Sequence, residues 1–187
     1  MNFGTCSKLF LLLKGETMQR IVTIEKALER KYPEQVVLVT TRGNDGKANV
    51  MACGWTCIIS GEPPMFILGI DEDSHTFELV RESKELVIAY PHEFMKEETL
   101  IAGSCHGDEV DKIAKASLNT QNAKKVKAPL LADAVANFEC ELVDIIKPGD
   151  CTLVIAKAVE AHINTDSTLK RLCTVDKGHE LSGVRPI

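Results

Sequence analysis

The sequence predicts a mainly β protein with α decoration, built as an antiparallel β-barrel with helices packed on it. Two pairs of β-like runs are joined by turn-forming clusters at residues 43–46 and 148–150, and such pairs are typical of β-hairpins. Hairpins outnumber the strand–helix–strand crossovers of a parallel sheet. The chain also contains neither a GxGxxG sequence nor a P-loop, which excludes the usual nucleotide-binding folds.

The first third of the chain predicts a helix followed by a hairpin. Apolar residues recur at helical spacing over residues 20–31, and Pro33 ends that helix. Residues 36–41 are rich in β-branched side chains and predict a strand that enters the turn at residues 43–46. The returning strand is expected to begin near Lys47 and to carry residues 49–59.

The remaining elements are expected to continue this pattern. Gly61 and the Pro63-Pro64 pair interrupt strand pairing, and the apolar run 65–70 predicts a strand that is buried on both faces. In chain order, we then expect a helix over 74–83, a strand over 86–89, helices over 93–101 and 108–117, a polar and basic loop over 119–127, and strands over 136–146 and 151–163.

Length and composition are those of one globular domain. The 187 residues are 44% hydrophobic and 26% charged, which argues against disorder. A net charge of −5 and an isoelectric point near 5.6 disfavour a nucleic-acid-binding surface. The basic patch of Lys124, Lys125 and Lys127 has a simpler interpretation as a solvated loop.

The cysteines and the N-terminal segment indicate a soluble, cytoplasmic protein with no membrane partner. The seven cysteines are scattered and include no CxxC pair, which favours reduced thiols. The apolar run 9–13 has only five residues, too few for a signal peptide or a membrane span. Residues 1–18 are expected to be a loosely attached extension, with Met18 as an alternative translation start, and residues 19–187 a single domain.

The segment 71–76 predicts a helix start that could bind an anion. Asp73 or Ser74 is a good N-cap, and the hydroxyls of Ser74 and Thr76 with the imidazole of His75 could add hydrogen bonds to a phosphate. Simple capping explains the same residues. The three consecutive carboxylates at 71–73 would repel a phosphate, so such a site requires a nearby cation, either Arg81 or Lys112.

A second candidate is the small-residue loop that precedes the helix predicted over 108–117. Its glycines, Gly103 and Gly107, would allow close backbone approach to a ligand. Lys112 is expected one turn into the helix, on the same face as Asp108. An ordinary connection between two helices is the alternative.

Trp55 is the only tryptophan and follows the small residues Ala52, Cys53 and Gly54. Small side chains would let a flat ring approach the strand backbone, although a core tryptophan is the commoner explanation. The adjacent Cys105 and His106 have poor spacing for a metal site, and we expect no metal. No GxSxG sequence supports a Ser-His-Asp triad.

These pieces, in this order, resemble the flavin-reductase-like, FMN-binding split-barrel family, in its flavoredoxin branch, over residues 32–163. The residues that carry the resemblance are Tyr32-Pro33, the run from Asn49 to Trp55, Pro63-Pro64, Ser74-His75-Thr76, Gly103-Ser104, Asp111-Lys112 and Gly149-Asp150.

The resemblance implies a split-barrel homodimer with one FMN for each subunit near the dimer interface. The strand backbone would line the isoalloxazine ring, helix-start residues would approach the phosphate, and three residues would close the site from the helical side. The implied cofactor-binding residues are Asn49, Met51, Ala52, Cys53, Trp55, Thr56, Ser74, His75, Thr76, Gly103, Ser104 and Lys112.

One departure from the family concerns the last hairpin. Many flavin reductases of this group carry a histidine directly after the Gly-Asp pair, where this chain has Cys151. His162, near the strand end, could serve instead for nicotinamide use. The tail after residue 170 matches only loosely, and nothing is carried over from it.

The leading interpretation is an FMN-binding oxidoreductase of the flavin reductase type that accepts electrons from NAD(P)H or from a protein donor. Flavin itself performs the redox chemistry, so the absence of an acid–base constellation is consistent with it. One alternative is a non-enzymatic flavoprotein electron carrier. Another is a split-barrel module that binds haem or another ligand.

Overall fold

The computed structural model describes residues 19–184, and the chain divides into two compact units, residues 1–31 and 32–187. The expected extension over residues 1–18 lies outside the described residues, and the boundary at residue 19 stays a prediction. In the first unit, helix α1 covers only Ile24–Leu28 instead of residues 20–31, and Thr23 caps it. None of its side chains is buried, so no packing extends the helix beyond this short piece.

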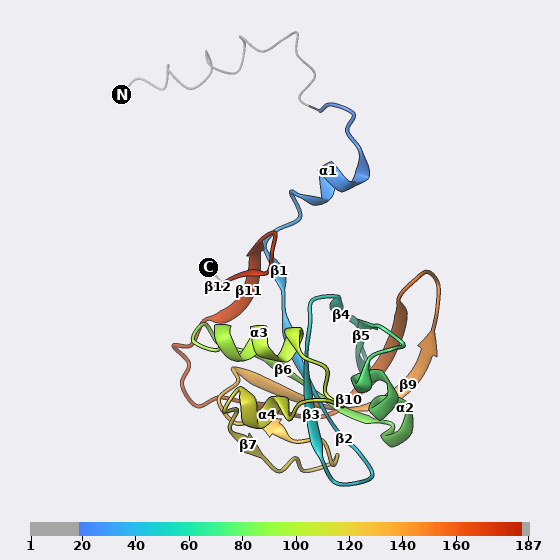
Figure 1. Cartoon of the computed structure of the whole chain (residues 1–187), viewed down its shortest axis with the longest axis vertical. Coiled ribbons are helices and arrows are strands. Elements are labelled where there is room, and N and C mark those ends of the chain that lie inside the picture. Colours follow the sequence, from blue (N-terminus) through green and yellow to red (C-terminus); the bar gives the residue numbers. More distant parts are fainter. Residues whose placement is uncertain (1–18, 185–187) are drawn as a thin grey trace. The chain divides into compact units, whose positions relative to one another are not determined.

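The second unit is a mainly β structure with few helices (Figure 1). Its strands are β1 Glu34–Gln35, β2 Val37–Arg42, β3 Ala48–Cys53, β4 Thr56–Gly61, β5 Pro64–Ile70, β6 Glu85–Tyr90, β7 Thr120–Gln121, β8 Leu130–Leu131, β9 Ala136–Ile146, β10 Thr152–Ile163, β11 Arg171–Asp176 and β12 Glu180–Val184. Its helices are α2 His75–Ser83, α3 Lys96–Ser104 and α4 Lys112–Lys115.

Seven strands form the main antiparallel sheet, in the order β3-β2-β6-β9-β10-β5-β4. The two predicted hairpins are confirmed, as β2–β3 and β9–β10. In the first turn, Gly43 donates its N–H to the carbonyl of Lys47 at 2.9 Å, and Gly46 has a φ of +82° that favours glycine.

The strand expected over residues 49–59 is instead two strands that lie at opposite edges of this sheet. β3 ends at Cys53 and pairs with β2, whereas β4 begins at Thr56 and pairs with β5. Only Gly54 and Trp55 join them, and the Trp55 carbonyl accepts a hydrogen bond of 2.7 Å from the Gly69 N–H. Because a two-residue link joins the two edges, the sheet must curl toward itself into a split barrel.

The central strands β2 and β6 are buried on both faces, whereas β5 faces the barrel core with one face. In β5, Phe66, Leu68 and Ile70 are buried while the residues between them are only half-buried, so the prediction of burial on both faces is wrong. The Pro63-Pro64 pair lies at the tight β4–β5 turn, where Gly61 pairs with Pro64. β9 and β10 begin and end within one residue of the predicted ranges 136–146 and 151–163.

The helices cover part of the barrel wall. α2 contacts β2 and β3, while α3 and α4 pack on β3. The helix expected over 93–101 extends to Ser104, so Gly103 and Ser104 belong to its last turn. The helix expected over 108–117 is short because Asp111 caps it, accepting a hydrogen bond of 3.0 Å from the Ala114 N–H.

Five of the described strands, which form two small sheets, were not predicted. Residues 120–121, expected in a loop, form β7 and pair with β8, while β1, β11 and β12 form a small three-stranded sheet.

Trp55 is 62% exposed, so its interpretation as a core residue is wrong. Among the described residues, no helix is both long and apolar enough to span a membrane.

Candidate cofactor site

The N-terminus of α2 has the predicted cap. The Ser74 hydroxyl oxygen accepts a hydrogen bond of 3.2 Å from the Phe77 N–H and donates one of 2.7 Å to the Asp71 carbonyl. In the described part of the chain, the backbone N–H groups of His75 and Thr76 have no acceptor. Free amides at the positive end of a nine-residue helix are suited to an anion.

Asn49 lies beside this helix start with an unsatisfied buried oxygen. Its side chain is on β3 and only 5% of the residue is exposed. The amide nitrogen donates to the hydroxyl of Thr76 at 2.9 Å and to that of Thr41 at 3.3 Å, but the oxygen Oδ1 has no hydrogen-bond partner within residues 19–184. A buried carbonyl without a donor is costly, so this group is poised to accept a hydrogen bond from a ligand.

Gly107 packs against both Asn49 and His75. A Cβ atom added at Gly107 would lie 2.1 Å from Asn49 Oδ1 and 3.2 Å from His75 Cδ2. Only glycine therefore fits at this position without displacing Asn49. Gly107 was noted in the sequence as part of a small-residue loop, but its partner could not be identified because Asn49 is far away in the chain.

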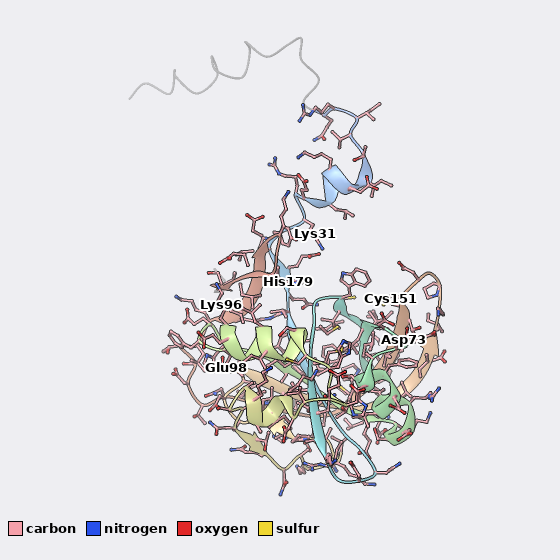
Figure 2. The ribbon with its side chains drawn as sticks, in the orientation of Figure 1. Lys31, Asp73, Lys96, Glu98, Cys151 and His179 are labelled. Carbon is pink, nitrogen blue, oxygen red and sulfur yellow. The ribbon has the colours of Figure 1, made fainter. Side chains whose placement is uncertain are left out.

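Two hollows meet at His75. A cavity of about 230 Å³ is lined by Glu72, Asp73, Ser74, His75, Phe77, Glu78, Arg81 and Asp108. A larger groove of about 860 Å³ includes Asn49, His75 and Gly107 and reaches the β2–β3 turn. Figure 2 labels Asp73 and Cys151, which lie where β5 ends and β10 begins.

The charge of the smaller cavity is mainly negative, as the acidic triplet predicts. Glu72 is bonded to Lys147 at 2.5 Å and to Thr152 at 2.7 Å, and these bonds hold the pKa of its carboxyl below the ordinary value. Arg81 is the cation that lines this cavity with Ser74 and His75. Of the two cations considered, the structure thus places Arg81 there.

Lys112 has a different environment from the one predicted. It begins α4, so it does not share a helix face with Asp108, which precedes the helix. Its side chain is buried, with 4% of the residue exposed, and its ammonium donates to the Ala102 carbonyl at 3.1 Å. Burial lowers the pKa of Lys112, because desolvation disfavours the charged form.

The residues predicted to hold a ring lie on both faces of β3 and at its end. Met51 and Cys53 pack in the barrel core, and burial raises the pKa of the Cys53 thiol to about 12. Ala52 faces α3, where a Cβ added at Gly103 would meet it at 3.3 Å. Thr56 is half-buried and its carbonyl accepts a hydrogen bond from the Gln35 side chain.

The twelve predicted residues thus fall into separate groups. Asn49, His75 and Thr76 meet beside Ser74, whereas Gly103, Ser104 and Lys112 lie at the C-terminal end of α3 and the start of α4. Within residues 19–184 no three metal-ligating side chains lie together.

His162 does not occupy the position of the missing histidine, where this chain has Cys151. Its Nε2 lies 2.6 Å from the Glu139 carboxylate. Cys151 lies at the opposite end of β10, and its Sγ would be 3.3 Å from a Cβ added at Gly69. Eleven positions at the usual strand rise separate the two residues by roughly 35–37 Å. Within one chain, His162 therefore does not lie at the position of Cys151, and its use for a nicotinamide stays a prediction.

Three comparisons relate this architecture to known proteins. The flavin reductase-like domain family matches residues 29–178. An uncharacterised protein of Pyrococcus abyssi is 34% identical over 128 residues, which are 68% of this chain and 73% of that protein. The FMN reductase (NADH) RutF of Agrobacterium fabrum is 25% identical over 158 residues, which are 75% of this chain and 86% of that protein.

The solved structure of flavoredoxin from Methanosarcina acetivorans has the same fold. The two structures give a TM-score of 0.79 at 20% sequence identity, covering 91% of this chain and 94% of the flavoredoxin. At this identity the likeness concerns the fold, and it confirms the mainly β split-barrel class expected from the sequence.

Proposed function

The chain belongs to the flavin reductase-like domain family, and we propose that it is an FMN-binding oxidoreductase. It would move electrons from NAD(P)H, or from a protein donor, through the bound flavin. The FMN reductase among its relatives acts with NADH, which supports a nicotinamide donor. Bound FMN would supply hydride and one-electron chemistry, so the protein need only bind, orient and tune it.

The observation that carries the proposal is the unsatisfied polar surface beside α2. FMN has a chain of hydroxyl groups that ends in a phosphate. The free N–H groups of His75 and Thr76 suit the phosphate, and the buried acceptor Asn49 Oδ1 suits a ribityl hydroxyl. The residues present therefore fit both the polar and the anionic parts of FMN.

The isoalloxazine ring of FMN would lie along β3 and along the residues that directly follow this strand. The proposed contacts there are the backbone of Met51, Ala52 and Cys53 with Trp55 and Thr56. Because the Cys53 side chain points into the core, its main chain would make the contact. Gly103, Ser104 and Lys112 would limit the site from the helical side.

The acidic rim restricts how the phosphate can bind. Glu72 and Asp73 line the cavity with Arg81, and a dianion beside them requires compensating charge. We assign this compensation to Arg81, which makes no ion pair within the described residues, together with the α2 amides. An Arg81→Gln variant would weaken FMN binding, and raising the salt concentration would reduce the difference from the wild type.

A homodimer is part of the proposal. β4 is an edge strand whose Cys57, Ile58 and Ile59 are exposed, by 65% for Ile58 and 44% for Ile59. Together with the exposed Trp55, they form an apolar surface next to the proposed ring site, and a second copy of the chain would cover it.

The electron-carrier interpretation is the second candidate, and the likeness to flavoredoxin favours it. Under this alternative the protein would hold FMN but show no steady-state turnover with NADH or NADPH. Reduction by a ferredoxin-type donor would then be faster than reduction by either nucleotide.

The visible absorption spectrum tests the proposal. The purified protein, or the protein mixed with FMN and desalted, should be yellow and should bleach anaerobically when NADH or NADPH is added. A colourless protein that retains no added FMN would contradict the proposal. A Soret band would instead identify the haem-binding alternative.

A further inference from the structure

Cys105 is a thiol that the proposed flavin site does not use, although its neighbours Ser104 and Lys112 border that site. It follows α3 directly and is partly exposed. The Lys115 ammonium donates to its Sγ atom at 3.2 Å, and the Ser104 hydroxyl lies 3.9 Å from the same sulfur. Lys115 comes from α4, so two separate helices build the contact.

A second observation concerns Lys112, one helical turn before Lys115. Only 4% of the residue is exposed. Among residues 19–184, no carboxylate lies within ion-pair distance of its ammonium. The Ala102 carbonyl satisfies one of its three N–H donors. Burial lowers the pKa of Lys112, and Cys105, ahead of Asp108, is the negative group that most opposes this effect.

Cations near a thiol favour its ionised form. The hydrogen bond from Lys115 is the largest cause that lowers the pKa of Cys105, followed by the Ser104 hydroxyl and the charges of Lys115 and Lys112. Reactive cysteines occur in such electropositive, partly exposed surroundings, whereas buried thiols such as Cys53 are inert.

We propose that Cys105 is a nucleophilic thiolate site, built by Lys115 and Lys112, that hydroperoxides oxidise to a sulfenic acid. The sulfur attacks one peroxide oxygen, so that an S–O bond forms and the O–O bond breaks. The sulfur loses two electrons, and the peroxide is reduced to water or an alcohol. The leaving oxygen takes its proton from the Lys115 ammonium or from solvent. This site goes beyond the proposed flavin function and does not depend on bound FMN.

Cys173 provides a control within the same chain. It is also partly exposed, and in the described part of the chain no ion pair or hydrogen bond involves its thiol. Full-length protein without FMN would be alkylated with iodoacetamide over a pH series, and peptide mass spectrometry would follow both cysteines in each sample. At neutral pH, Cys105 should react at least about threefold faster than Cys173, because more of it is thiolate.

Two substitutions at the exposed Lys115 test whether its positive charge makes Cys105 reactive. Lys115→Met should slow the alkylation of Cys105 and move its pH dependence upward, while Lys115→Arg should keep the wild-type rate because it retains the positive charge. Neither variant should change the alkylation of Cys173. Equal reactivity of the two cysteines, or an unchanged rate in Lys115→Met, would overturn the proposal.

Sulfenic acid formation is measured separately. After brief exposure to dilute hydrogen peroxide, dimedone should label Cys105 and leave Cys173 unlabelled, and Lys115→Met should lose most of the label. Absence of dimedone label at Cys105 in the wild type would also overturn the proposal. Because the protein in these assays carries no flavin, a failure of FMN binding would not affect either result.

Discussion

The carboxylate of Glu139 and the side-chain amide of Asn49 are both buried in the barrel wall, but their hydrogen bonding differs. Glu139 is fully buried and accepts four hydrogen bonds, from His162 at 2.6 Å and from the N–H groups of Lys124, Lys125 and Val126. Asn49 leaves its oxygen without a partner among the described residues. The comparison separates a closed polar cluster, which stabilises the fold, from an open one, which is suited to a ligand.

Asn137 sharpens the comparison because it is the same residue type with the same exposure, 5%. Its amide nitrogen donates to the Leu131 carbonyl at 3.0 Å, and its oxygen accepts from the Leu131 N–H at 2.9 Å. A buried asparagine with both amide atoms bonded to one backbone residue is a structural group, so it serves as the matched control for Asn49.

The largest expected effect is on stability at Glu139. Glu139→Ala leaves three backbone N–H groups and His162 without their acceptor, so the free energy of unfolding should fall by about 3 kcal/mol. Urea unfolding followed by circular dichroism measures the change. A variant that unfolds at the wild-type urea concentration would show that the cluster contributes little.

The second effect is on binding. Asn49→Leu keeps the branched shape of the side chain but removes the acceptor, and the FMN dissociation constant should rise by about tenfold or more. Quenching of FMN fluorescence on titration measures it. Asn137→Leu should instead lower stability by about 2 kcal/mol and leave the affinity of the folded protein unchanged. If both variants bind FMN equally well, the distinction between open and closed clusters fails.

The third effect is acid sensitivity. Burial alone would raise the pKa of Glu139, but the hydrogen bonds from Lys124, His162, Lys125 and Val126 outweigh it and hold the pKa below the ordinary 4.5. A lowered folded-state pKa stabilises the protein at pH values above 4.5, and this contribution is lost as the pH falls through the folded value. The wild type should therefore lose more stability than Glu139→Gln on acidification, measured by urea midpoints at several pH values. Parallel loss in both proteins would contradict this.

The smallest effect is expected for the ion pair between Lys124 and Glu160, which lies beside the Glu139 cluster. Its atoms are 2.9 Å apart, but the Lys124 side chain is 67% exposed. Glu160→Gln should leave the urea midpoint unchanged within error, because solvent screens such pairs. A loss comparable to that of Glu139→Ala would mean that the whole loop acts as one unit.

The hairpins and the helix start at Ser74 could be predicted because their signals are local. Turn residues, alternation and N-cap chemistry occupy a few consecutive positions. The break at Gly54 could not be predicted, since a run of apolar and small residues gives no sign of which strand it pairs with. The sequence of residues 136–146 also does not reveal that Glu139 points inward, because the four hydrogen-bond partners of Glu139 come from other segments of the chain.

The same reasoning applies to the candidate site. Ser74, His75 and Thr76 are contiguous and were predicted as a group, but their contact with Asn49 and Gly107 depends on the path of the chain. The local sequence predicts a shared helix face for Lys112 and Asp108, but the cap at Asp111 starts the helix after Asp108. The proximity of Cys105 to Lys115 has no sequence signal, since ten residues and a change of helix separate them.

The link formed by Gly54 and Trp55 also determines how the barrel could fail. It is the only covalent connection between the two edges of the main sheet, and Trp55 is exposed there. β3 and β4 are already the edge strands of this sheet, so a protease that cut the link would create no new edge but would remove the tether that keeps the two edges close together. Edge strands that can move apart are more accessible to strands from other chains, so a nick at this point would favour aggregation.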